Sequence, residues 1–150
     1  AIGKFDVVLS IWTAIGYYGR KTDERIFKMA GRRLRQRGVF MILDTMSREW
    51  LLNHYCPAIY DDVGDYLIIH RGKFDRAHSQ NFEHWDYYKK QGKDLIFEAE
   101  PDTDLRIYAH HELVAMAEQA GLKFEAAFDN LKLLDPIRPD SRVNMVFRKP

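Results

Sequence analysis

A run of apolar, largely β-branched residues near the start of the chain, Phe5–Ile11, constrains the fold more than any other segment. Such runs are typical of strands buried on both faces, which occur in parallel sheets covered by helices. The residues that follow, 12–19, include a Trp, a Thr, two Tyr and two Gly. Ligands of open α/β sheets bind beyond the carboxyl ends of the strands. We therefore expect the segment from Ser10 to Tyr18 to line a ligand site.

A helix and a second apolar strand complete a βαβ pattern. Thr22 is expected to be the N-cap of the helix and Gly38 its C′ residue, and Val39–Asp44 is the second strand. The two strands of a right-handed βαβ crossover run parallel, so their carboxyl ends lie at the same edge of the sheet. We therefore expect Ser10–Trp12 to lie next to Asp44–Met46.

The rest of the chain predicts a short helix, an antiparallel meander and a closing α/β segment. Ser47 is the expected cap of the short helix. The strands of the meander mix charged with aromatic residues, which is typical of an antiparallel sheet with one solvated face. Residues 60–105 are therefore an insertion in the βαβ pattern. It could cover a pocket or form a dimer interface. The expected elements are a helix at 48–55, strands at 65–74, 81–89 and 94–100, a helix at 110–120, strands at 123–129 and 142–148, and a loop at 131–140.

Composition and charge exclude several classes of protein. The 150 residues predict one domain, and 23 Lys and Arg nearly balance 22 Asp and Glu, so nucleic acid and membrane are not expected partners. The cluster of arginines at 32, 33, 35 and 37 is better explained as a solvated face that complements the helix dipole. One cysteine, Cys56, excludes an internal disulfide and favours a reducing, cytoplasmic setting. The start at Ala1, without Met, favours a truncated or processed chain.

The common catalytic motifs are missing from the sequence. The segment around Ser10 lacks the glycines of a nucleophile elbow, and neither a P-loop nor a G-x-G-x-x-G motif is present. The histidines show no ligand pairing at helical spacing with an acidic partner, so we predict no metal site. They are His54, His70, His78, His84, His110 and His111.

Several segments, taken in order, resemble class I S-adenosylmethionine-dependent methyltransferases of the small-molecule type. Phe5–Ser10 with Ile15–Tyr18 resembles the family's fourth motif, and Ala30–Gly38 resembles the turn before its fifth strand. The other matches are Arg106–Tyr108, Glu112–Leu113, Ala120–Lys123 and Ser141–Arg148, which resemble the run before the sixth strand and the antiparallel seventh strand. The resemblance implies an α/β fold: a partial Rossmann-like sheet with strands resembling 4, 5, 7 and 6, flanking helices and the inserted meander, in which residues 1–150 are the C-terminal half.

This resemblance also implies a chemistry and a set of site residues. The cofactor would be S-adenosylmethionine, and the methyl group would pass to N or O of a small molecule. Asp44 and Tyr18 would be catalytic. Ser10, Ile11 and Trp12 would bind the cofactor, and the substrate contacts would be Trp12, Tyr17, Tyr18, His70, Arg106 and Tyr108. Simpler roles stay open: a helix cap for Asp44, a structural role for Arg106 and Tyr108, and an exposed strand face for His70.

The family's first strand with its glycine-rich turn, and the acidic residue that holds the cofactor ribose, have no counterpart in these 150 residues. We therefore expect the chain to be inactive without an N-terminal half. The Phe5–Ile11 strand would then present an apolar edge that pairs with that half or with a second copy of the chain. The alternative is a half-domain with a binding or scaffold role and no catalysis.

Overall fold

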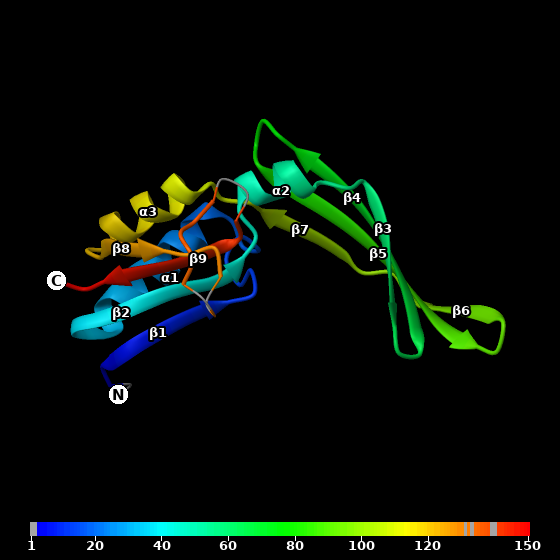
Figure 1. Ribbon diagram of the computed structural model, residues 1–150, viewed down its shortest axis with the longest axis horizontal. Coiled ribbons are helices and arrows are strands. Elements are labelled where there is room, and N and C mark those ends of the chain that lie inside the picture. The colour runs from blue at the N-terminus through cyan, green and yellow to red at the C-terminus, as the bar shows by residue number, and fades with distance from the viewer. Residues whose placement is uncertain (1–2, 131, 133, 139–140) are drawn as a thin grey trace. The chain divides into compact units, whose positions relative to one another are not determined.

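The computed structural model (Figure 1) describes residues 3–130, 132, 134–138 and 141–150, so part of the expected loop at 131–140 lies outside the described residues. The chain forms two compact units. The first contains residues 1–54 and 106–150, and the second contains residues 55–105.

The first unit is built on a four-stranded sheet in the order β1-β2-β9-β8. β1 and β2 are parallel, whereas β9 is antiparallel to both β2 and β8 (Figure 1). This arrangement confirms the predicted α/β class and the strand order of a Rossmann-like methyltransferase sheet. The strands are β1 (Phe5–Ile11), β2 (Leu34–Thr45), β8 (Lys123–Ala127) and β9 (Val143–Arg148).

The first helix, α1 (Arg20–Arg33), begins before the residue that the sequence indicated. Thr22 lies inside the helix, so its prediction as the N-cap is wrong. The residue that precedes α1 is Gly19, whose φ of 78° suits glycine, and its carbonyl accepts hydrogen bonds from the N–H groups of Thr22 and Asp23. The glycine conformation therefore decides the start of the helix.

The end of α1 also differs from the prediction, because Gly38 lies in β2 and is not a C′ residue. Leu34 is extended and fully buried, so the chain leaves the helix where its side chain enters the core. A Cβ at position 38 would come within 3.1 Å of the Asp6 carbonyl oxygen. Gly38 therefore permits the close approach of β2 to β1.

The core of the first unit lies where α1 and α3 (His110–Gln119) pack against the sheet. The Phe27 and Phe40 rings meet edge to face at 5.3 Å between centroids, and Phe40 stacks on Phe147 at 6.3 Å. The helices approach so closely that a Cβ on Gly31 would lie 2.5 Å from the Ala120 carbonyl oxygen. This core supports the carboxyl ends of β1 and β2.

The short helix α2 (Arg48–His54) starts as predicted. The buried Ser47 hydroxyl oxygen accepts a hydrogen bond from the Trp50 N–H at 2.9 Å, and the hydroxyl donates to the Ser141 carbonyl at 3.2 Å. Ser47 is thus the helix cap, and it also ties α2 to the segment before β9.

β1 is not buried on both faces, contrary to the prediction from its apolar run. Its apolar side chains are 42–52% exposed at four positions: Phe5, Val7, Leu9 and Ile11. These four alternate positions share the face of β1 opposite Val8, and Val8 is the residue that packs against the core. β1 also lies at the edge of the sheet, and no strand of the described residues pairs with its outer side. An apolar groove of about 530 Å³ runs along β1 and α1. This agrees with the expected apolar edge.

The second unit is an antiparallel sheet in the order β3-β4-β5-β6, with β7 paired to β5. The sequence predicted β4, β5 and β6 but missed β3, whose residues are all exposed, and β7, which is short and acidic. The strands are β3 (Ala58–Val63), β4 (Tyr66–Asp75), β5 (Gln80–Gln91), β6 (Asp94–Ala99) and β7 (Asp102–Arg106). Across the residues that the structure describes, every helix is too short or too polar to cross a bilayer.

Candidate functional site

The candidate site is built on the segment between β1 and α1, residues 12–19. Trp12 and Thr13 both have left-handed backbone conformations, with φ of 56° and 55°. The Trp12 N–H donates to the Leu43 carbonyl at 3.1 Å, and the Thr13 hydroxyl oxygen accepts from the Met46 N–H at 3.1 Å. The ends of β1 and β2 are therefore neighbours, as the βαβ pattern predicted. Left-handed conformations are costly for a Trp and a Thr, so these two hydrogen bonds must hold the bend.

Aromatic side chains of this segment face solvent. Trp12 is 77% exposed, Tyr18 is 78% exposed and Tyr17 is 47% exposed. The Tyr17 and Tyr18 rings lie 6.5 Å apart at a tilt of 51°. At the end of β1, Ser10 is buried and Ile11 is exposed. The structure thus brings four of the predicted site residues, Ser10, Ile11, Trp12 and Asp44, to one edge of the sheet.

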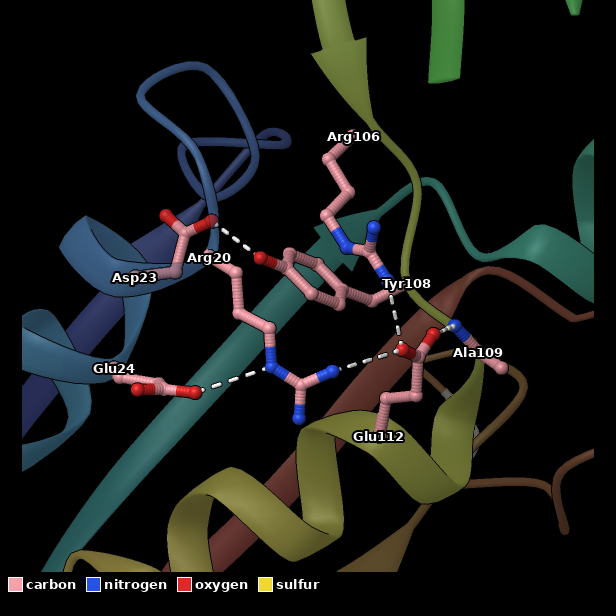
Figure 2. A network of polar contacts seen from close by, with 7 residues as sticks. All are labelled: Arg20, Asp23, Glu24, Arg106, Tyr108, Ala109 and Glu112. Atoms are coloured by element: carbon pink, nitrogen blue, oxygen red, sulfur yellow. Dashed lines mark hydrogen bonds and ion pairs between the residues drawn. The ribbon is translucent and has the colours of Figure 1, made fainter. Parts of the chain in front are cut away.

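The buried carboxylate of Asp23 anchors this segment to Tyr108, which precedes α3 (Figure 2). The hydroxyl of Tyr108 donates to Oδ2 of Asp23 at 2.6 Å, and Oδ1 accepts from the Gly16 N–H at 3.2 Å. Asp23 is only 1% exposed. Burial and the hydrogen bond to Asp23 raise the pKa of Tyr108 well above its usual value. The Tyr108 hydroxyl therefore keeps its proton and donates it in a hydrogen bond to the buried carboxylate of Asp23.

Arg106 adds a second connection to the same segment. Its main-chain N–H donates to the Gly16 carbonyl at 3.0 Å, and its guanidinium lies 5.1 Å from the centroid of the Tyr108 ring. Arg106 and Tyr108 thus hold the segment from below, which agrees with the structural role that the sequence left open for them. Direct contact of either residue with a substrate stays a prediction.

Glu112 forms ion pairs with Arg106 and Arg20. Its carboxylate accepts from Arg106 at 3.0 Å and from the Ala109 N–H at 3.0 Å, and Arg20 lies 3.6 Å away (Figure 2). Burial tends to raise the pKa of Glu112, but the Ala109 N–H and the Arg106 guanidinium outweigh it, so the pKa lies below its usual value. Arg20 continues the chain of ion pairs to Glu24 at 3.1 Å. The result is a charged brace at the start of α3.

Asp44 lies at the end of β2 and does not cap α2, since Ser47 does so. Arg142 binds it twice, through Nε to the carboxylate at 2.6 Å and through Nη2 to the main-chain carbonyl at 2.8 Å. The same guanidinium lies 5.1 Å from the Trp50 ring centroid. A cavity of about 390 Å³ opens beside these three residues and is also lined by His54, Asp129, Asn130, Arg138, Ser141 and Asn144.

His70 lies in the second unit, on β4. Its ring packs against Trp85 at a tilt of 39°, with 4.0 Å between centroids, and Nε2 lies 3.0 Å from the Asp61 carboxylate. The side chain is 13% exposed, so it is held within its own sheet and does not form the exposed strand face considered as an alternative.

Sequence reasoning missed three residues of the site. Asp23 had no predicted role, although it is the buried anchor of the segment. Trp50 and Arg142 were predicted only as parts of a helix and a strand, although both line the cavity beside Asp44. The available signal was weak: an acid four residues after the aromatic segment 12–19, and a basic residue directly before the last strand.

No protein-family model matches the chain, and no curated protein matches it. Solved structures do match. An S-adenosylmethionine-dependent methyltransferase from Clostridium acetobutylicum covers 97% of this chain with a TM-score of 0.79 at 14% identity. The CcbJ methyltransferase from Streptomyces caelestis covers 100% with a TM-score of 0.80 at 15% identity. An amino pentose methyltransferase from Micromonospora echinaspora, CalS10, covers 99% with a TM-score of 0.72 at 14% identity.

The fold of this chain is therefore that of these methyltransferases over nearly all of its residues. The converse does not hold, because the chain spans 58%, 63% and 59% of the three solved chains.

Proposed function

We propose that the chain is the acceptor-side part of an S-adenosylmethionine-dependent methyltransferase that methylates N or O of a small molecule. One observation carries the proposal: the fold similarity to methyltransferases extends over 97–100% of the chain. The aromatic segment at the ends of β1 and β2 supports it, because that edge is where ligands of open α/β sheets bind.

The residues at this edge fit the reactive end of the cofactor. When bound, S-adenosylmethionine supplies a methyl group on a positively charged sulfonium. The exposed Trp12, Tyr17 and Tyr18 offer aromatic faces, which attract cations. In the proposal, Ser10, Ile11 and Trp12 contact the methionine side, and Trp12, Tyr17 and Tyr18 form the acceptor pocket.

Catalysis in this proposal rests mainly on alignment, because the methyl donor is already activated. Asp44 is the proposed general base, whose carboxylate receives the proton of the acceptor N–H or O–H. Tyr18 is the second proposed catalytic residue, and its hydroxyl would hydrogen-bond to the acceptor. The ion pair with Arg142 keeps the Asp44 carboxylate in place. Arg106 and Tyr108 position the segment through Gly16 and Asp23.

We also infer that cofactor binding needs a strand beside β1. The exposed apolar side chains of β1 and the groove of about 530 Å³ along it favour pairing with further polypeptide, either an N-terminal half or a second copy. The same groove supports the second candidate function, a half-domain that binds a partner without catalysis.

Isothermal titration calorimetry with S-adenosylmethionine tests the proposal. We would compare this chain with a longer form that carries any sequence encoded ahead of Ala1. Binding by the longer form alone supports a methyltransferase that needs its other half, and binding by the chain itself shows that the 150 residues suffice. If neither form binds the cofactor, the methyltransferase proposal fails and the non-catalytic role is favoured.

A further inference from the structure

A cluster of metal-ligating side chains lies on one face of the second unit. His84 and Asp86 are two residues apart on β5, so their side chains point to the same face. The Trp85 N–H donates to the Pro101 carbonyl at 3.1 Å, which places Pro101 opposite Trp85. Glu100 and Asp102, on either side of Pro101, therefore face His84 and Asp86. The pairing of two strands gathers four residues that the sequence spacing keeps apart.

The distances within this cluster suit a metal ion. One ligand atom each from His84, Asp86 and Glu100 lies within 4.8 Å of the others. Nε2 of His84 is 3.0 Å from Oδ1 of Asp86. Ligands about 2.0–2.2 Å from a tetrahedral zinc ion lie roughly 3.3–3.6 Å from each other, so small side-chain rotations would close the site.

His84 is oriented as a metal ligand usually is. Its Nδ1 lies 2.7 Å from Oδ1 of Asp102, which favours a proton on Nδ1. Its Nε2 lies 3.0 Å from Oδ1 of Asp86, so a metal ion that binds Nε2 would displace the proton of this ion pair. A carboxylate that holds the remote nitrogen of a ligand histidine is a common support of zinc sites. Asp102 would thus hold the His84 ring in position for a metal ion.

The charges of the cluster leave room for a cation. Three carboxylates, of Asp86, Glu100 and Asp102, gather around His84, whereas Arg71 supplies one fixed positive charge through its ion pair with Asp86. The Asp86 side chain is only 8% exposed, so water screens its charge poorly. A cavity of about 490 Å³, lined by Arg71, His84 and Asp102 among others, gives access.

We propose that Nε2 of His84 and the carboxylates of Asp86 and Glu100 bind a divalent transition-metal ion, with Zn²⁺ as the best match, and that Asp102 positions His84. Mixed imidazole and carboxylate ligands favour Zn²⁺ over Mg²⁺ or Ca²⁺, which take oxygen ligands. A water would complete the tetrahedron. The bound ion would fasten β5 to the segment that leads into β7.

The test is a Zn²⁺ titration of the metal-free full chain in competition with a chromogenic chelator. We expect one ion per chain, and at least tenfold weaker binding in His84→Ala and in Glu100→Gln. Asp102→Asn should weaken binding about 10- to 100-fold, as expected for loss of a supporting carboxylate. At the same Zn²⁺ concentration, the Tm of the unaltered chain should also rise more than that of Glu100→Gln.

The matched control is His78→Ala. His78 also pairs with an aspartate, through Nδ1 at 2.7 Å from Asp75, but it lies outside the cluster. This variant should bind Zn²⁺ like the unaltered chain. The proposal is overturned if the unaltered chain binds no stoichiometric Zn²⁺, or if His78→Ala and His84→Ala lose affinity equally. Glu100→Gln changes an exposed residue with little change in size, so it keeps the test decisive should His84→Ala fail to fold.

Discussion

The Tyr108 hydroxyl donates a 2.6 Å hydrogen bond to the carboxylate of Asp23, 85 positions earlier in the chain. This bond joins the segment before α3 to the start of α1, and the same carboxylate holds the Gly16 N–H. The aromatic segment of the candidate site is therefore anchored from below by groups that do not face solvent.

We predict that Tyr108→Phe lowers the free energy of unfolding by about 1–3 kcal/mol, because the variant leaves a buried carboxylate short of a donor. Urea denaturation followed by circular dichroism measures the change. Tyr17→Phe, which removes an exposed hydroxyl, is the matched control and should change stability by less than about 0.5 kcal/mol. Equal effects of the two substitutions would contradict the anchoring role.

The pH dependence of stability should contain a contribution from Glu112. Its pKa is lower in the folded chain than the ordinary value of about 4.5, so its stabilisation is present above that pH and is lost as the pH falls through the folded-state pKa. Glu112→Gln should therefore lose less stability on acidification than the unaltered chain. Denaturation series between pH 7 and pH 3 measure this.

The control for the pH series is Glu118→Gln on the exposed side of the same helix. Its curve should follow that of the unaltered chain. A Glu112→Gln curve that is parallel to the unaltered one throughout this range would show that the brace of Arg106 and Arg20 contributes nothing to acid sensitivity.

Gly31→Ala should destabilise the chain, although Ala normally stabilises a helix interior by about 0.5–1 kcal/mol relative to Gly. The added Cβ would lie 2.5 Å from the Ala120 carbonyl, so α1 and α3 must separate. We expect a loss of about 1–3 kcal/mol, as for other overpacked cores. Thermal unfolding measures it, with Lys28→Ala on the exposed side of α1 as the control. A stabilised Gly31→Ala variant would show that the helices are not in close contact.

The open side of β1 should drive self-association of the chain. Leu9→Lys places a charge on this edge and should shift the sedimentation profile toward the monomer at high protein concentration. Tyr60→Lys, at the edge of the other sheet, is the control and should leave the profile unchanged. If only Tyr60→Lys reduces association, the second unit supplies the interface and β1 does not.

Local patterns predicted the elements that depend on local chemistry. The apolar runs located β1 and most of β2, the βαβ pattern placed their ends together, and the hydroxyl of Ser47 identified the start of α2. These predictions succeed because each rests on residues that are close in sequence or on a handedness rule that holds for nearly all proteins.

The features that the sequence did not reveal depend on distant contacts. Gly38 resembled a helix end, but the close approach of Asp6 from another strand places it inside β2. The apolar run of β1 predicted burial on both faces, but only the face of Val8 packs against the core, because burial depends on which distant elements cover each face. The ion pair of Asp44 with Arg142 joins residues 98 positions apart, beyond any local pattern.

The segment 12–19 separates two tasks among its residues. Its hold on the fold uses main-chain groups of Trp12 and Gly16 and the hydroxyl of Thr13, whereas the rings of Tyr17 and Tyr18 point outward. Exposed side chains can be exchanged at little cost in stability. The outer aromatic surface can therefore change its residues without any change in the contacts that hold the segment beneath it.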